Sequence, residues 1–167
     1  MSKKWLPPEA FAATLPHATV FGDAFFTDED DRPVQLRATY SSAHPWQWPG
    51  GLAEPGERPW ETAVRECREE TGIHLAGPTK LLTTVFGLPG KGWPLATVGL
   101  VFGEGRLAPG QLTGSVLDPD EHDQVRALTV PEWQGLMPGR DHTRLEAVMA
   151  ARHAGVPAHF DTWEGEA

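Results

Sequence analysis

The 167-residue sequence is poor in cysteine, tyrosine and long apolar runs. Its one cysteine, Cys67, cannot form an intramolecular disulfide, which fits a reducing compartment, so we expect a cytoplasmic protein. No apolar run approaches the roughly 20 residues that span a bilayer, and the first ten residues lack the apolar core of a signal peptide. We therefore expect no membrane association. At an apolar helix position, Cys67 is expected to be a core residue rather than a nucleophile.

Positive charge is also scarce: the sequence has 14 Lys and Arg residues against 23 Asp and Glu residues, which gives a net charge of −9. A nucleic-acid groove needs a basic surface, so no nucleic-acid partner is expected. A small phosphorylated ligand stays compatible with this charge, since metal ions can supply positive charge locally. The length predicts one domain over residues 17–155, between a Pro-rich lead-in, 1–16, and an acidic tail, 156–167.

The most informative segment is 51–73, GLAEPGERPWETAVRECREETGI. Pro59 suits a first helical turn and Gly72 a left-handed exit, so a helix is predicted over 59–71. Three glutamates share one face near the helix C-terminus, where the helix dipole disfavours negative charge: Glu66, Glu69 and Glu70. A solvated charged face is one interpretation. The other is a site for a hard divalent cation, Mg²⁺ or Mn²⁺, held by oxygen ligands.

The spacing resembles the Nudix box, G-x5-E-x7-R-E-U-x-E-E-x-G-U, in which U is a bulky apolar residue. All fixed positions are filled, by Gly51, Glu57, Arg65, Glu66, Glu69, Glu70 and Gly72. Cys67 and Ile73 take the apolar positions. The resemblance implies an α/β fold, a Nudix-type α/β/α sandwich with a mixed β-sheet. It also implies a hydrolase that uses Mg²⁺ (or Mn²⁺) to cleave the diphosphate linkage of a nucleoside diphosphate derivative. Other catalytic motifs, such as GxxxxGK[ST], HExxH and GxSxG, are missing from the sequence.

The resemblance also implies roles for single residues. Glu66, Glu69 and Glu70 would be metal ligands together with the carbonyl of Gly50, and Glu66 would act partly as a base. Glu57 and Arg65 would orient those carboxylates, and Gly51 would let the backbone approach a phosphate.

A later loop often supplies one more acidic ligand or base in the family. Its candidates here are Asp118, Asp120, Glu121 and Asp123. Glu121 is our choice because it precedes a predicted strand, although the run could also be a solvated turn. His122 could be an acid or base, but a lone surface histidine usually has no special role.

The substrate stays open. A nucleobase could stack on Trp46, Phe86 or Trp93, which could equally be strand core residues, as we expect for Trp48. Pro89 resembles the downstream proline of ADP-ribose-cleaving members, whereas the tyrosine of dinucleoside polyphosphate hydrolases is missing. A nucleoside triphosphate and a sugar nucleotide such as ADP-ribose both remain, a homodimer is left open, and a non-catalytic nucleotide sensor is the alternative function.

The remaining pattern is that of a mixed α/β chain. Strands are predicted at 17–27, 33–40, 46–48, 80–88, 95–103 and 123–129, and further helices at 130–136 and 141–154. The acidic segment 28–31 is expected to be the solvated turn of a hairpin between the first two strands, and 104–121 is expected to be a loop.

Overall fold

The computed structural model describes residues 5–75, 79–90 and 93–161. Its helices are α1 (Pro8–Ala12), α2 (Pro59–Thr71), α3 (Val130–Trp133) and α4 (Gly139–Ala154). Its strands are β1 (Ala18–Thr27), β2 (Val34–Ala38), β3 (Trp46–Gln47), β4 (Gly50–Leu52), β5 (Lys80–Gly87), β6 (Ala96–Arg106), β7 (His122–Ala127) and β8 (Ala158–Phe160). The mixed α/β class is confirmed. None of the described helices is long and apolar enough to cross a membrane.

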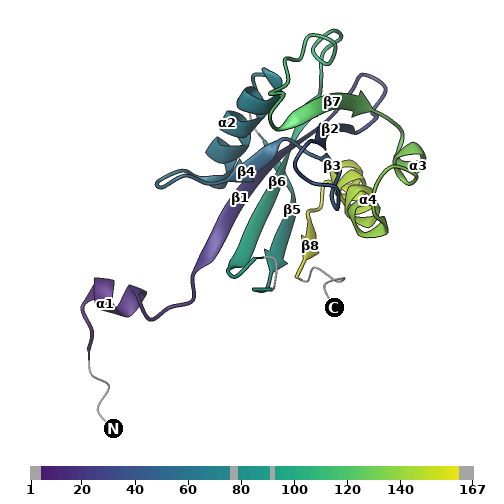
Figure 1. Ribbon diagram of the computed structural model, residues 1–167. Coiled ribbons are helices and arrows are strands. Elements are labelled where there is room, and N and C mark those ends of the chain that lie inside the picture. Colours follow the sequence, from purple (N-terminus) through teal and green to yellow (C-terminus); the bar gives the residue numbers. More distant parts are fainter. Residues whose placement is uncertain (1–4, 76–78, 91–92, 162–167) are drawn as a thin grey trace.

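The strands form two sheets (Figure 1). The larger has the order β4-β1-β6-β5-β8, and the smaller has the order β3-β2-β7. In the larger sheet β1 runs parallel to β6, while β4 is antiparallel to β1 and β5 antiparallel to β6. The predicted mixed sheet is therefore confirmed. The short α1 stands away from the body beyond the start of β1, and all its residues are exposed (Figure 1).

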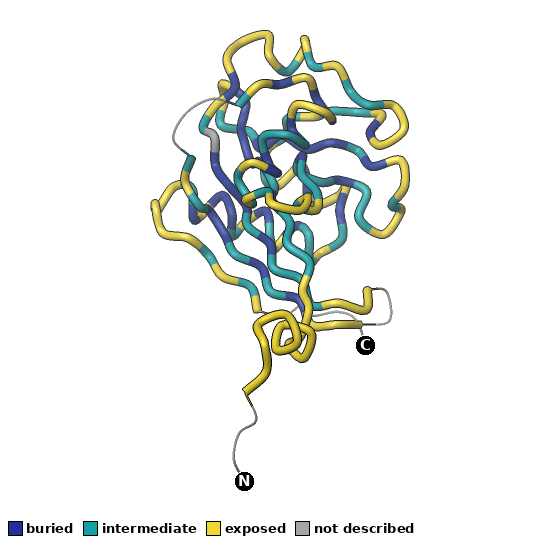
Figure 2. The backbone as a smooth tube through the Cα atoms, turned by 90° about the vertical axis from the view of Figure 1, so that its left-hand side faces the viewer, coloured by how far each residue is buried: buried dark blue, intermediate teal, exposed yellow. Residues whose placement is uncertain are grey.

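The two faces of the larger sheet bury different side chains because successive strand residues point in opposite directions. Phe26 of β1 packs in one apolar cluster with Ala63 and Cys67 of α2. Phe25 lies in a second cluster with Leu145 and other residues of α4. One helix therefore covers each face, and the buried segments run along the strands between them (Figure 2). Cys67 is fully buried, which confirms its predicted place in the core.

The helix α2 spans the predicted residues, from Pro59 in the first turn to a left-handed Gly72 with φ of 69° at its end. Its first turn is closed by the carboxylate of Glu61, which accepts a hydrogen bond of 2.9 Å from the Arg58 N–H. Glycine adopts this exit conformation without a steric penalty. These local signals explain why the boundaries could be predicted.

The predicted hairpin between the first two strands is wrong. β1 has β4 and β6 on its two sides, so β2 pairs instead with β3 and β7 in the smaller sheet. Between the end of β1 and the residue before β2 there is an isolated antiparallel bridge, from Thr27 to Pro33. The turn between them is also not simply solvated. The buried Asp28 carboxylate accepts hydrogen bonds of 3.1 and 2.8 Å from the N–H groups of Asp30 and Arg32.

Several other boundaries also differ from the prediction, most clearly those of β6 and β8. β6 continues to Arg106, three residues into the predicted loop, because it pairs there with the end of β1. β8 lies beyond residue 155, where the predicted domain ended, and pairs in parallel with Thr83–Val85 of β5. A strand of three residues is too short to show an alternating pattern, so the sequence did not predict it. Apart from Asp161, the segment DTWEGEA of the acidic tail lies outside the described residues.

Candidate active site

The helix α2 lies directly on β1 and β4, which places the glycines 50–51 beneath its glutamates. The Gly50 N–H donates a hydrogen bond of 3.1 Å to Glu70 Oε2. A Cβ atom on Gly51 would lie 2.3 Å from Glu66 Oε1, and one on Gly22 of β1 would lie 1.9 Å from the Pro59 carbonyl oxygen. Since real Cβ contacts are longer, a side chain at position 22 would force α2 away from β1, and one at position 51 would displace the Glu66 carboxylate.

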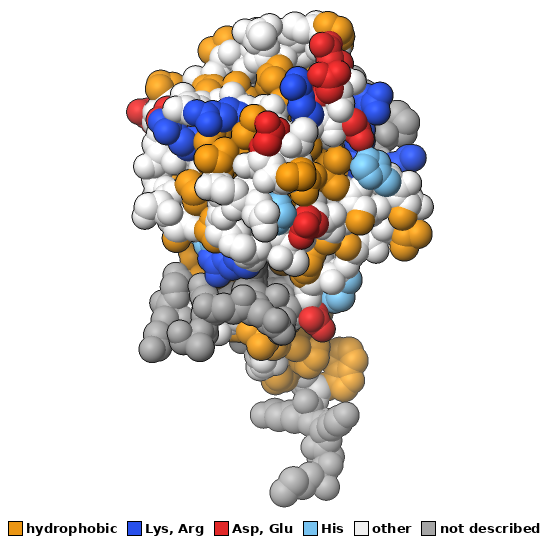
Figure 3. Space-filling model, turned by 90° about the vertical axis from the view of Figure 1, so that its right-hand side faces the viewer, with side chains coloured by type: hydrophobic (Ala, Val, Ile, Leu, Met, Phe, Trp, Pro, Cys, Tyr) orange, Lys and Arg blue, Asp and Glu red, His pale blue; other side chains and the backbone are white. Residues whose placement is uncertain are grey.

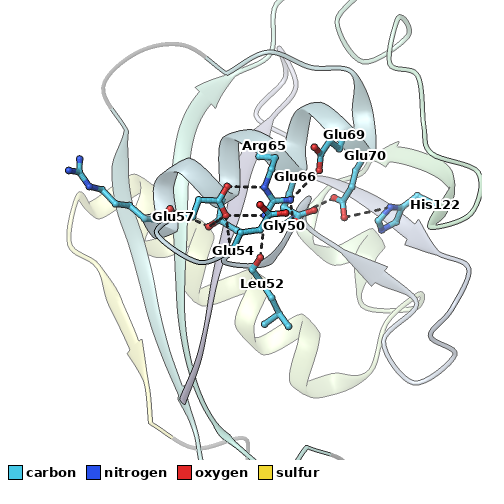
Figure 4. A network of polar contacts seen from close by, with 11 residues as sticks. Gly50, Leu52, Glu54, Glu57, Arg65, Glu66, Glu69, Glu70 and His122 are labelled. Carbon is cyan, nitrogen blue, oxygen red and sulfur yellow. Dashed lines mark hydrogen bonds and ion pairs between the residues drawn. The ribbon is translucent and has the colours of Figure 1, made fainter. Parts of the chain in front are cut away.

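Arg65, which was predicted to orient the carboxylates of the helix, lies among acidic side chains (Figure 4). Its Nε and Nη2 donate to the two Glu57 oxygens at 2.8 and 3.0 Å. Its Nη1 donates to Glu66 Oε1 at 2.8 Å and to Glu69 Oε2 at 3.1 Å. These hydrogen bonds from Arg65 are the largest cause that lowers the pKa of Glu57, to about 2. The guanidinium therefore orients three carboxylates at once.

Glu70 is the most buried glutamate of the cluster, at 3% exposure. Burial raises the pKa of Glu70 to about 9; the Gly50 N–H lowers it, and the charges of Glu66 and Glu121 raise it further. Burial also raises the pKa of Glu66. A buried carboxylate among other acids is unfavourable unless positive charge is added nearby. The site therefore suits a cation.

Of the four acids proposed for the later loop, the structure brings Glu121 to this site. One ligand atom from each of Glu70, Glu121 and His122 lies within 4.8 Å of the others. Asp123 instead forms an ion pair with Arg37 on the neighbouring strand. The expectation that His122 is a surface residue is wrong, since it is 1% exposed. Burial lowers the pKa of His122.

The donor set fits a hard divalent cation. Carboxylate oxygens come from Glu70 of the helix and from Glu121, and the Gly50 N–H is bonded to Glu70. Oxygen ligands of this type suit Mg²⁺ or Mn²⁺. The predicted ligand and orienting roles stay predictions that this arrangement supports.

A cavity of about 260 Å³ opens on the other side of Gly50. Its walls carry the aromatic rings of Trp46 and Trp48 and the charged side chains of Asp23 and Arg144. The Arg144 guanidinium lies 5.4 Å from the centre of the Trp48 ring. Burial raises the pKa of Asp23 to about 7, although Arg144 lowers it. Sequence reasoning missed Asp23 and Arg144, because neither stands in a motif and they come from distant elements, β1 and α4.

The aromatic residues proposed for substrate binding are separated by the fold. Trp46 lines the cavity, but it is 7% exposed and its ring packs on Trp133 at 5.0 Å between centres. Phe86 pairs with Val98 across β5 and β6 and is not among the residues of the cavity wall. Trp93 donates a hydrogen bond of 3.2 Å to the Thr19 hydroxyl near the start of β1, four residues before Asp23. The geometry thus favours Trp46 over the other two.

One face of the molecule is mixed in charge (Figure 3). On the face that Figure 3 presents, the described Lys and Arg side chains are interspersed with acidic and uncharged ones and form no continuous basic area. This agrees with the net charge of −9.

Comparisons with known proteins agree with the expected family and fold. The family model described as "NUDIX domain" matches residues 16–151. "Nucleoside diphosphate-linked moiety X motif 6" of Xenopus laevis is 32% identical over 72 residues, 42% of this chain and 33% of that protein. "RNA pyrophosphohydrolase" of Bradyrhizobium sp. (strain ORS 278) is 38% identical over 63 residues, 35% of this chain and 38% of that protein. These matches thus span about a third of each curated relative.

Among solved structures, the MutT protein from Methanosarcina mazei Go1 matches with a TM-score of 0.66 and 20% identity, covering 82% of this chain and 96% of that chain. At this identity the likeness concerns the fold alone. It is the fold expected from the sequence.

Proposed function

Because the chain belongs to the NUDIX domain family, we propose that it is a hydrolase that cleaves the diphosphate linkage of a nucleoside diphosphate derivative with bound Mg²⁺ or Mn²⁺. The observation that carries the proposal is the buried carboxylate of Glu70, held by the Gly50 N–H among other acids beside a cavity. Such a site is costly for an apo protein and favourable once a cation and a phosphate are bound.

We propose different roles for the residues of the acidic cluster. Glu69, Glu70 and Glu121, with the Gly50 carbonyl, would hold the cation. When bound, a divalent cation neutralises charge on the phosphate oxygens and lowers the pKa of a coordinated water. Arg65 binds Glu66 Oε1, so we assign Glu66 Oε2 as the atom that accepts the proton of the attacking water. Gly51, with no side chain, leaves room for the phosphate next to Glu66.

The cavity beside Gly50 is the place that we assign to the nucleoside. Trp46 and Trp48 offer aromatic surface there, and Asp23 and Arg144 offer polar groups that could bind base edges or a ribose. Since Gly50 also binds Glu70, a nucleoside in the cavity would present its phosphates to the acidic cluster. The names of the relatives refer to nucleoside diphosphate-linked moieties and to RNA, so they do not decide between a nucleoside triphosphate and a sugar nucleotide.

The test is turnover by the purified protein of nucleoside triphosphates, ADP-ribose and other sugar nucleotides with Mg²⁺ or Mn²⁺. The products, phosphate, pyrophosphate or nucleoside monophosphate, identify the bond that is cleaved. We expect Glu69→Gln and Glu70→Gln to lose at least about 100-fold in turnover while keeping their urea midpoints, because the amide preserves shape and removes a ligand charge. Full activity of both variants would contradict the proposal.

The matched control is Glu146→Gln on α4, whose carboxylate is 57% exposed and lies 3.7 Å from His142. It removes the same charge at a distance from the cluster and should leave turnover unchanged. Tight binding of one nucleotide without hydrolysis of any would indicate a sensor instead of an enzyme.

A further inference from the structure

His122 is a buried histidine that lies in one group with the carboxylates of Glu70 and Glu121. It is the first residue of β7 and follows Glu121 directly, with its backbone N–H bonded to the Asp118 carbonyl at 2.7 Å. The Thr39 N–H binds the Glu121 carbonyl at 2.8 Å, and the Tyr40 ring packs edge-on against the imidazole at 6.1 Å between centres. The imidazole is therefore held in place, and Figure 4 shows it turned toward Glu70.

The imidazole of His122 is buried without a hydrogen bond. At 1% exposure, neither of its ring nitrogens has a hydrogen-bond partner among the described residues. Its Nδ1 lies 4.0 Å from Glu70 Oε1, which is too far for a hydrogen bond. Buried polar atoms are nearly always satisfied, so a species that the protein binds is expected at this position.

The distances are compatible with one bound cation, and the charges favour a cation over a water molecule. Metal bonds to imidazole nitrogen and carboxylate oxygen are each about 2.0–2.2 Å, so two ligands of one ion can lie up to about 4.2 Å apart. The 4.0 Å between His122 Nδ1 and Glu70 Oε1 falls within that limit, and Glu121 offers an oxygen in the same group. A water molecule would satisfy the nitrogen but leave the charges of the carboxylates uncompensated.

We propose that His122 is a nitrogen ligand of the cation held by Glu70 and Glu121, which makes this site prefer Mn²⁺ and Co²⁺ to Mg²⁺. Imidazole is a softer donor than a carboxylate or water, and divalent transition metals gain more from it than Mg²⁺ does. An all-oxygen site would lack that additional preference. The proposal deepens the proposed function, because it concerns the same cation site and rests on a cation binding there.

The experiment measures cation binding rather than turnover. Titration of the protein with Mn²⁺, followed by electron paramagnetic resonance of the free ion, yields the dissociation constant, and competition yields that of Mg²⁺. We expect His122→Asn to weaken Mn²⁺ binding about tenfold or more and Mg²⁺ binding much less. Pulsed electron paramagnetic resonance of the Mn²⁺-loaded protein should show a directly bound imidazole nitrogen, whose coupling disappears in His122→Asn.

The matched control is His142→Asn, which also removes a buried histidine, one whose Nε2 lies 2.9 Å from the Val130 carbonyl oxygen on the α4 side. It should keep the nitrogen coupling and the Mn²⁺ affinity. Circular dichroism and urea midpoints identify a variant that fails to fold, and the nitrogen coupling of the wild type tests the proposal without any variant.

The outcomes separate this inference from the proposed function. Mn²⁺ binding with turnover but without nitrogen coupling, or an equal loss of Mn²⁺ and Mg²⁺ affinity in His122→Asn, overturns the role of His122 alone. A wild-type protein that binds no divalent cation overturns both proposals.

Discussion

Asp31 is the acidic residue that joins the turn between β1 and β2 to the end of α4. Its carboxylate lies 3.2 Å from Arg152 Nη2, 2.8 Å from His153 Nε2 and 3.4 Å from Arg106 Nε. Burial acts to raise the pKa of Asp31, but the hydrogen bonds from these three residues outweigh it and lower the pKa to about 2. The substitution Asp31→Asn removes the charge and keeps the backbone, because asparagine tolerates the φ of 63° at this position.

The expected loss of stability follows from that pKa. A pKa of about 2 in place of 3.8 corresponds to about 2.4 kcal/mol of stability at neutral pH. The side chain is 24% exposed, and water and salt screen its charge. We therefore expect Asp31→Asn to lower the free energy of unfolding by about 1–2 kcal/mol at pH 7. Because the folded state has the lower pKa, this contribution is complete above about pH 5, about half is left at pH 3, and the rest is lost as the pH falls through about 2.

The assay is urea denaturation of the wild type, Asp31→Asn and a control at pH 7 and pH 3. The control is Asp30→Asn, one residue away, whose carboxylate is 67% exposed and lies 3.2 Å from Arg32. An exposed pair of this kind contributes little, so its loss should stay below about 0.5 kcal/mol. Equal urea midpoints for Asp31→Asn and the wild type at pH 7 would refute the reasoning. So would a deficit that is as large at pH 3 as at pH 7.

Two other substitutions test how the acidic helix is held. Gly22→Ala should lower the melting temperature by several degrees, because its Cβ would lie 1.9 Å from the Pro59 carbonyl oxygen and α2 would have to move; Gly135→Ala, where a Cβ meets open space, should melt as the wild type does. Arg65→Lys keeps the charge but cannot reproduce the paired hydrogen bonds to Glu57. The turnover of Arg65→Lys with Mg²⁺ should fall at least about tenfold. Unchanged kinetics would show that the paired hydrogen bonds of the guanidinium to Glu57 are not needed.

The parts of the site that could be predicted depend on local geometry. The residues of α2 were predicted because Pro59 and Gly72 mark its two ends, and helical spacing then places Glu66, Glu69 and Glu70 on one face. The same short segment contains Glu57 and Arg65. Glu57 lies in the turn that precedes the helix and Arg65 in the helix itself, so their contact depends on local geometry alone. No long-range pairing has to be known for this arrangement.

The parts that could not be predicted depend on contacts distant in sequence. The strand pattern of β2 is compatible with a hairpin, and only its pairing with β7, almost 90 residues away, shows that it belongs to the smaller sheet. The burial of His122 follows from the same pairing, since its neighbour across the strands is Ala38. Likewise Asp23 and Arg144 are 121 residues apart and meet only at the cavity. Periodicity carries no information about such neighbours.

Gly50 joins the acidic cluster to the cavity. Its N–H binds Glu70 on one side, and a side chain at its position would meet Asp23 Oδ1 at 2.2 Å on the other. Gly50 is also paired with Asp23 in the register of β4 and β1, so the strand pairing sets the distance between cavity and cluster. A substitution such as Trp48→Ala in the cavity wall should therefore change which nucleotide binds, as a change in KM, with less effect on kcat. A substitution of Glu70 should lower kcat with less effect on KM. The reason is that different side chains, held apart by the sheet, bind the nucleoside and the cation.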